Sequence, residues 1–142
     1  MTKINFDDII NSITLFEYKI LKPFYNLYNG YLTRPQAQVL SLICDNPGIF
    51  SKDISILLGI PKQYSSKIVQ KLVSEELVVN KQGLKDGRTQ PLFPTEKGIS
   101  LLNNQINKSN NYFYERLQKL TSEESEEILN AFSVLHKLLK KI

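Results

Sequence analysis

The side chains best suited to recognition chemistry in this chain are amides, hydroxyls and ammonium groups that recur along one side of a predicted helix. Apolar residues at positions 60, 68, 69 and 72 share one face of that helix, with Ser65 among them. Lysine and glutamine hydrogen-bond base edges, and short serine side chains let a backbone approach closely. The opposite face carries all of these types: Lys62, Gln63, Ser66, Lys67, Gln70 and Lys71.

Such a helix packs onto its own protein by one side and suits the major groove of double-stranded DNA by the other. Gln63, Ser66, Lys67 and Gln70 are the expected base or near-base contacts, and the lysines at 62 and 71 are the expected phosphate contacts. The alternative is an ordinary solvated helix surface. The hairpin and the capped helix that follow in the sequence favour nucleic-acid contact.

A basic hairpin follows this helix. Residues 77–81 and 89–93 are predicted strands, and the loop over 82–88 contains two glycines suited to turns. Lys85, Asp86, Arg88 and Thr89 are the candidate DNA contacts here, and Arg88 at the tip suits a narrow minor groove. The alternative is an exposed Arg88 paired with Asp86, worth at most about 1 kcal/mol at a surface.

Positive charge is concentrated in the same segment. The 142-residue chain has a formal net charge of +4. Residues 60–93 contain six basic and three acidic side chains, so they hold +3 of that charge. A mildly basic chain alone is weak evidence for a polyanionic partner. The concentration of positive charge in the predicted helix and hairpin strengthens the prediction that this segment binds nucleic acid.

Helices are predicted on both sides of this segment. A long helix over residues 5–28 should kink at Pro23, or end there and start another turn, and Gly30 is a plausible stop. Its wide apolar stripe predicts a partner chain. Thr33, Ser51, Thr95 and Thr121 are predicted N-caps. The helices that follow these caps are expected over about 33–45, 51–58, 61–75, 95–119 and 121–142.

Composition argues against several other classes of protein. One cysteine, Cys44, and one histidine, His136, leave no metal cluster and no nucleophilic site, and no phosphate loop is present, so neither an enzyme nor a cofactor is expected. Cys44 lies among apolar residues and is expected to be inert rather than a peroxide sensor, and His136 to be structural. No apolar run is long enough to cross a membrane, and the expected location is the cytoplasm.

The order of elements and the hairpin residues resemble the MarR family (multiple-antibiotic-resistance regulators) of winged helix-turn-helix repressors. The most specific similarity is Asp86-Gly87-Arg88 followed by Thr95-Glu96-Lys97-Gly98, and residues 72–78 resemble the family's exit from the recognition helix. The chain departs from the family pattern at Tyr64, Glu76 and Pro94. Glu76 stands at a usual glycine position, so a positive φ is expected there.

The resemblance implies a mainly α fold with a small two- or three-stranded β wing, as one domain over residues 1–142. Residues 33–98 would form the winged helix-turn-helix lobe, and residues 1–30 and 99–142 a helical dimerisation lobe. It implies a homodimer on a pseudo-palindromic operator and a small aromatic or phenolic effector. The aromatic residues that could line an effector pocket, or else belong to the core, are Tyr18, Phe24, Tyr25 and Tyr28.

The function predicted from sequence is therefore a DNA-binding transcriptional regulator, a homodimeric repressor modulated by a small ligand. The alternative is a protein-interaction module on a winged-helix scaffold without specific DNA binding, which the unusual Tyr64 and Glu76 favour.

Overall fold

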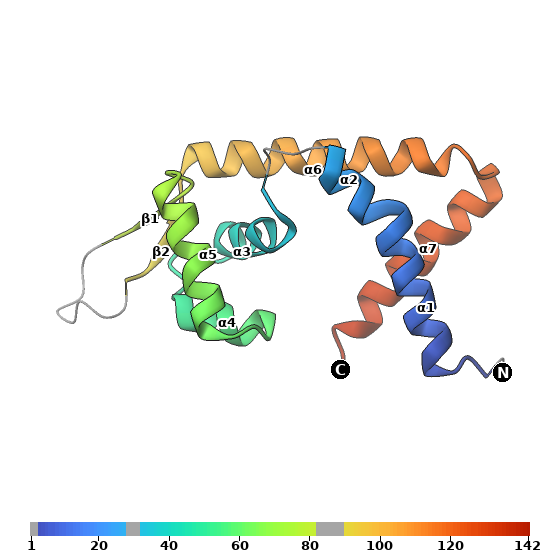
Figure 1. Cartoon of the computed structure of the whole chain (residues 1–142), viewed down its shortest axis with the longest axis horizontal. Coiled ribbons are helices and arrows are strands. Elements are labelled where there is room, and N and C mark those ends of the chain that lie inside the picture. Colours follow the sequence, from blue (N-terminus) through green and yellow to red (C-terminus); the bar gives the residue numbers. More distant parts are fainter. Residues whose placement is uncertain (1–2, 28–31, 82–89) are drawn as a thin grey trace. The chain divides into compact units, whose positions relative to one another are not determined.

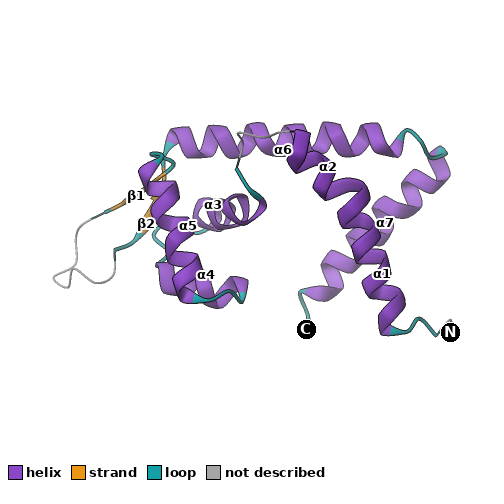
Figure 2. Ribbon diagram, viewed as in Figure 1, coloured by secondary structure: helices purple, strands orange, loops and turns teal. Residues whose placement is uncertain are grey.

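The computed structural model describes residues 3–27, 32–81 and 90–142. Helices dominate the described residues, with one small β-sheet (Figures 1 and 2). The elements in chain order are α1 (Phe6–Phe16), the π-helical segment η1 (Glu17–Leu21), α2 (Lys22–Leu27), α3 (Arg34–Asp45), α4 (Ser51–Leu58), α5 (Lys62–Ser74), β1 (Val78–Asn80), β2 (Leu92–Pro94), α6 (Glu96–Leu117) and α7 (Ser122–Leu139).

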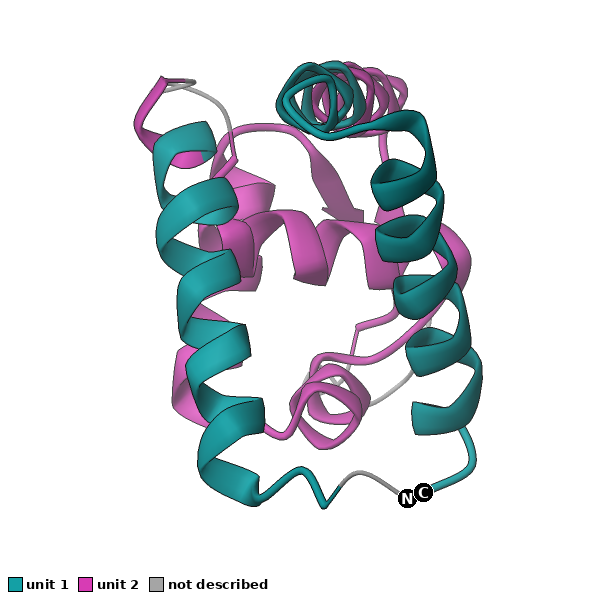
Figure 3. Ribbon diagram, turned by 90° about the vertical axis from the view of Figure 1, so that its right-hand side faces the viewer, with its two compact units in different colours: residues 1–24, 108–142 teal, residues 25–107 magenta. Residues whose placement is uncertain are grey.

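The chain forms two compact units, coloured separately in Figure 3. Unit 1 comprises residues 1–24 and 108–142, and unit 2 comprises residues 25–107. Helix α6 contributes its first part to unit 2 and its last part to unit 1. The lobe expected over residues 33–98 lies within unit 2.

Unit 2 is built around one hydrophobic core that α3, α4, α5 and the sheet share. Leu40, Ile43, Ile54 and Leu72 are fully buried in it. The side of α5 that faces this core is therefore fixed by burial, at roughly 1.5–3 kcal/mol for each large apolar side chain.

The sheet is a two-stranded antiparallel hairpin in which Val79 pairs with Phe93. An isolated bridge joins Ile49 to Leu92: the Leu92 N–H donates to the Ile49 carbonyl (2.9 Å), and the Gly48 N–H donates to the Leu92 carbonyl (2.7 Å). This bridge attaches the base of the hairpin to the segment that precedes α4. The expected two- or three-stranded wing is thus two strands plus one bridge within the described residues.

A π-helical turn, η1, ends two residues before Pro23, where the sequence predicted a kink or a helix end. The Lys22 N–H donates to the Glu17 carbonyl, five residues back. Proline has no N–H and its ring clashes with the preceding turn, so a wider turn just before it keeps the helix continuous. Helix continuity from α1 through α2 confirms the long helix expected here, while Gly30 lies outside the described residues.

Three of the four predicted N-caps are confirmed. Thr33 and Thr121 each form a capping box, and the Thr95 hydroxyl accepts a hydrogen bond from the Gly98 N–H (3.0 Å). The Ser51 prediction is wrong: Phe50 is the N-cap of α4, and Ser51 is its first helical residue. Ser51 is half-buried, and its hydroxyl oxygen is buried without a hydrogen-bond partner among the described residues.

Unit 1 contains a small aromatic cluster. The ring centre of Phe16 lies 5.0 Å from that of Phe132 and 6.3 Å from that of Phe113. Much apolar surface remains exposed around this cluster. The large apolar residues that lie exposed on α1 are Phe6, Ile9, Ile10, Ile13 and Leu15, and those on α7 include Leu135, Leu138 and Leu139.

Candidate nucleic-acid interface

Helix α5 is held by the turn that precedes it and by its apolar back. Gly59 adopts the left-handed conformation (φ +62°) that ends α4 and turns the chain toward α5. On the inner face of α5, Ser65 and Leu72 are fully buried, and Ile68 and Val69 are 7% exposed. The predicted division of α5 into a buried face and an outer face is therefore present.

The outer face of α5 presents the residues that the sequence singled out. Lys62, Gln63, Lys67, Gln70 and Lys71 are exposed, and Ser66 is half-buried. Within the described residues, Lys71 pairs with Glu75 (Nζ–Oε1 3.1 Å), whereas Lys62 and Lys67 form no ion pair. Two ammonium groups on this face are thus available to a polyanion without breaking a contact. Tyr64, near the helix start, is also exposed.

The junction between α5 and the hairpin explains the Thr-x-x-Gly motif. The Thr95 Oγ1 donates to the Glu76 carbonyl (2.7 Å), and the Thr95 N–H donates to the Leu77 carbonyl (3.1 Å). A Cβ added at Gly98 would lie 2.1 Å from the Leu77 carbonyl oxygen, closer than any real contact. Glycine at 98 therefore lets the first turn of α6 lie directly on the backbone that leaves α5.

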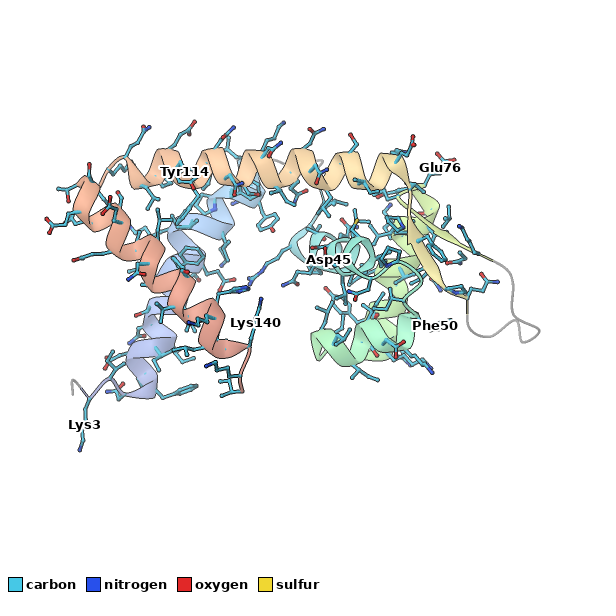
Figure 4. All side chains as sticks on the ribbon, turned by 180° about the vertical axis from the view of Figure 1, so that it is seen from behind. Lys3, Asp45, Phe50, Glu76, Tyr114 and Lys140 are labelled. Carbon is cyan, nitrogen blue, oxygen red and sulfur yellow. The ribbon has the colours of Figure 1, made fainter. Side chains whose placement is uncertain are left out.

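Glu76 adopts φ +61°, as its place at a usual glycine position predicted. It is labelled in Figure 4, just beyond the end of α5. The left-handed conformation reverses the chain between α5 and β1, and the Thr95 hydroxyl bond holds the carbonyl of the same residue. Lys97 adds a contact across this junction, donating to the Glu75 carbonyl (2.9 Å).

A groove of about 360 Å³ lies beside the outer face of α5. Ser66 and Gln70 line it from α5, and Ser51 lines it from the start of α4. Asn80 and Gln90 line it from the base of the hairpin. Sequence reasoning missed Ser51, Asn80 and Gln90, because only the fold brings these three segments together. From sequence, only the polar character of Asn80 and Gln90 at the base of the predicted hairpin could have indicated them.

The other candidate contacts of the hairpin, Lys85, Asp86, Arg88 and Thr89, lie outside the described residues, as does Tyr28 among the aromatic candidates. At the described base of the hairpin, the Lys81 Nζ lies 4.4 Å from the ring centre of Phe93. This contact holds the ammonium group of Lys81 just after the end of β1.

Two of the candidate effector-pocket aromatics, Tyr18 and Phe24, lie in unit 1. Tyr18 is exposed in η1, and the Lys22 Nζ lies 4.0 Å from its ring centre. Phe24 is buried, and its ring centre lies 5.5 Å from that of Tyr112. Tyr112, which the sequence reasoning did not single out, is 5% exposed, and its hydroxyl has no hydrogen-bond partner within the described part of the chain.

The third described aromatic candidate, Tyr25, belongs to unit 2 and is half-buried. Burial raises the pKa of the Tyr25 phenol, and the nearby positive charge of Arg34 acts in the opposite direction. The phenol therefore stays neutral well into the alkaline range, as a hydrogen-bonding group rather than a charge.

Cys44 is half-buried at the end of α3. Burial, and then the negative charge of Asp45, raise the pKa of its thiol. A raised pKa lowers the thiolate fraction on which reactivity depends. Among the described residues, no group of three or more histidine, cysteine or acidic side chains could hold a metal ion. No helix in the same part of the chain is long and apolar enough to cross a membrane.

A short helix, a left-handed glycine turn, a second helix with an exposed polar face and an antiparallel hairpin together define a winged helix-turn-helix protein of the DNA-binding regulator class. Residues 32–89 match the MarR family. An uncharacterized HTH-type transcriptional regulator of Bacillus subtilis (strain 168), YybA, is 26% identical over 133 residues, which cover 94% of this chain and 81% of YybA. The chain is thus similar to the MarR family over residues 32–89 and to a transcriptional regulator over most of its length.

Solved structures share the fold over nearly the whole chain. The transcriptional repressor CouR bound to a 23-mer DNA duplex superposes with a TM-score of 0.71 at 22% identity, covering 95% of this chain and 92% of CouR. The Mycobacterium tuberculosis MarR family protein Rv2887 in complex with salicylic acid gives a TM-score of 0.67 at 16% identity, covering 94% of this chain and 98% of Rv2887.

Proposed function

We propose that the chain is a homodimeric repressor that binds a pseudo-palindromic operator through α5 and the hairpin and responds to a small aromatic or phenolic molecule. The observation that carries the proposal is the division of α5. Its back is buried in the core of unit 2, and its outer face exposes lysine and glutamine side chains. That outer face supplies the donor groups that read base edges in the major groove.

The exposed apolar surface of unit 1 supports dimerisation. Ile13 on α1 is 57% exposed and Leu138 on α7 is 51% exposed, within a larger group of exposed apolar residues on the same two helices. Extensive exposed apolar surface of this kind suits a protein–protein interface. We assign it to a second copy of the chain, with residues 1–30 and 99–142 as the dimerisation lobe.

The relatives support the remaining parts of the proposal. CouR was solved on DNA and Rv2887 with salicylic acid, so the shared fold accommodates both kinds of partner. Tyr18, Phe24, Tyr25 and Tyr28 are the proposed effector-lining residues. A phenolic effector would stack on such rings and hydrogen-bond the hydroxyls of the tyrosines.

Binding of variants to a duplex selected by the protein from a random library tests the proposal. Gln70→Ala should relax sequence preference at one position of each half-site, by the ~1–3 kcal/mol that a bidentate amide–base contact provides. Lys67→Ala and Arg88→Ala should weaken binding. Gln38→Ala, an exposed amide on α3 outside the α5 face and the proposed dimerisation lobe, is the matched control and should change nothing. Binding that is indifferent to the changes at Gln70, Lys67 and Arg88 would refute the assignment of the interface.

The oligomeric state provides the second test. The wild-type protein should have twice the 16.4 kDa mass of the chain in solution. Leu138→Glu, which places a charge in the proposed interface, should shift the mass toward that of the single chain. A wild-type protein that stays single at micromolar concentration would refute the dimer.

A further inference from the structure

The middle of α6 is built from residues that form helices poorly. Five of the nine residues from 103 to 111 are asparagines, and all five are exposed. Asparagine lies near the unfavourable end of the helix propensity scale, because its side chain hydrogen-bonds nearby backbone groups in non-helical conformations. The local sequence therefore supports a helix only weakly here, although α6 runs unbroken through this stretch (Figure 2).

Buried contacts hold α6 on either side of a short interval but not within it. Gln105 is 4% exposed, and its amide bonds the N–H (2.9 Å) and the carbonyl (3.0 Å) of Leu32. Tyr112 is 5% exposed, and its ring centre lies 5.5 Å from that of Phe24. Of residues 106–111 between these two anchors, four are exposed, two are half-buried and none is buried. Since most helical stability in proteins comes from packing, this interval lacks the support that its sequence also fails to give.

The boundary between the two compact units falls in the same interval. Unit 2 ends at residue 107 and unit 1 resumes at residue 108 (Figure 3). Gln105 thus ties α6 to a residue of unit 2, and Tyr112 ties it to a residue of unit 1. The weak stretch of helix is a property of the sequence and the boundary is a property of tertiary packing, and the two coincide.

We infer that residues 106–111 form a hinge in α6, which opens and closes while the buried contacts on both sides stay formed. Opening breaks backbone hydrogen bonds of an exposed segment, and no buried side chain has to leave a core. The hinge joins unit 2, which carries α5, to unit 1. The consequence for DNA rests on the proposed function: a dimer with this hinge binds operators whose half-sites differ in spacing.

Amide hydrogen exchange of the free wild-type protein tests the hinge. Relative to the unfolded chain, amides of residues 106–111 should exchange about tenfold or more faster than those of residues 100–105. The triple variant Asn107→Ala/Asn110→Ala/Asn111→Ala should slow exchange in the hinge by about tenfold or more, because all three changes introduce a better helix former.

The double variant Asn103→Ala/Asn104→Ala is the matched control. It replaces the same kind of exposed residue in the same helix, but in the turn next to the buried Gln105 anchor and outside the hinge. Exchange of residues 106–111 should therefore stay at the wild-type rate. Equal protection all along α6 in the wild type, or equal slowing by the two variants, would overturn the hinge.

Duplexes with one base pair added or removed between the half-sites test the role of the hinge in binding. The starting duplex is the one that the protein selects from a random library. The triple variant should bind the selected spacing as tightly as the wild type. It should bind the altered spacings about tenfold more weakly than the wild type, because the open form that they require is rarer by that factor.

The outcomes separate the hinge from the proposed function. If both proteins respond equally to spacing while exchange shows the hinge, its role in operator binding is wrong and the proposed function stands. If the wild type binds no duplex, the proposed function fails together with the spacing argument. Hydrogen exchange decides the hinge itself in either case.

Discussion

Replacing Glu76 with glycine should stabilise the folded protein. Glu76 adopts φ +61°, where a residue with a Cβ is disfavoured by about 1–2 kcal/mol. Glycine removes that penalty but loses roughly 0.5–1 kcal/mol to the greater entropy of the unfolded chain. Glycine also removes an ion pair, in which Glu76 Oε2 lies 3.9 Å from Lys97 Nζ. The Glu76 side chain is 85% exposed and that of Lys97 is 62% exposed, so this pair contributes little to stability.

The expected net gain is therefore about 0.5–1 kcal/mol, or roughly 2–4 °C in melting temperature for a chain of this length. Guanidinium unfolding followed by circular dichroism measures it, at one fixed protein concentration because dimerisation adds to apparent stability. Glu76→Ala should remain close to wild type, since it removes the charge and keeps the strained backbone.

Glu75→Gly is the matched control. Glu75 has φ −89° and pairs with Lys71, so glycine there relieves nothing and should destabilise the protein by about 0.5–1 kcal/mol. Equal effects of Glu76→Gly and Glu76→Ala, or equal effects of glycine at 75 and 76, would refute the reasoning from backbone strain.

Three further predictions concern other parts of unit 2. Gly98→Ala should destabilise the protein by about 3 kcal/mol or more in the same unfolding assay, because its Cβ would lie 2.1 Å from the backbone oxygen of Leu77. Gln105→Ala should cost about 2–4 kcal/mol by thermal melting, because the buried Gln105 amide bonds both the N–H (2.9 Å) and the carbonyl (3.0 Å) of Leu32, and its loss leaves both unpaired. Cys44 should react with iodoacetamide at pH 8 more slowly than free cysteine, because its raised thiol pKa keeps it protonated there; reaction as fast as free cysteine would contradict this.

The pH dependence of stability follows from the same kind of shift. Tyr25 has a higher pKa in the folded than in the unfolded protein, so above the ordinary phenol pKa the unfolded state releases its proton first. The contribution of the neutral Tyr25 phenol to the free energy of unfolding is fully present below that pH. It is lost as the pH rises through the pKa of Tyr25 in the folded protein. Tyr25→Phe should lessen the alkaline loss, measured by unfolding at a series of pH values above neutrality.

The helical frame and α5 were predictable because local patterns specify them. The alternation of apolar and polar residues over 60–72 fixed the buried and exposed sides of α5, and Thr33 and Thr121 carry their own capping partners three residues later. The positive φ of Glu76 was predictable because this residue stands after the recognition helix, at a position where the resembled family usually has glycine.

Features that depend on distant segments were not predictable. Phe50 rather than Ser51 caps α4, because the bridge between Ile49 and Leu92 sets how the chain enters that helix. The buried bonds between Gln105 and Leu32 join residues far apart in sequence. The groove likewise takes its polar lining from α4, α5 and the hairpin at once, and no single stretch of sequence carries its signature.

If two copies of the α5 outer face read one operator, selection of bound duplexes from a random library will show it. The expected result is an enriched pseudo-palindrome with half-sites about one helical turn apart, ~34–36 Å. Enrichment of no sequence, or of a single asymmetric site by a protein that remains one chain, would contradict it.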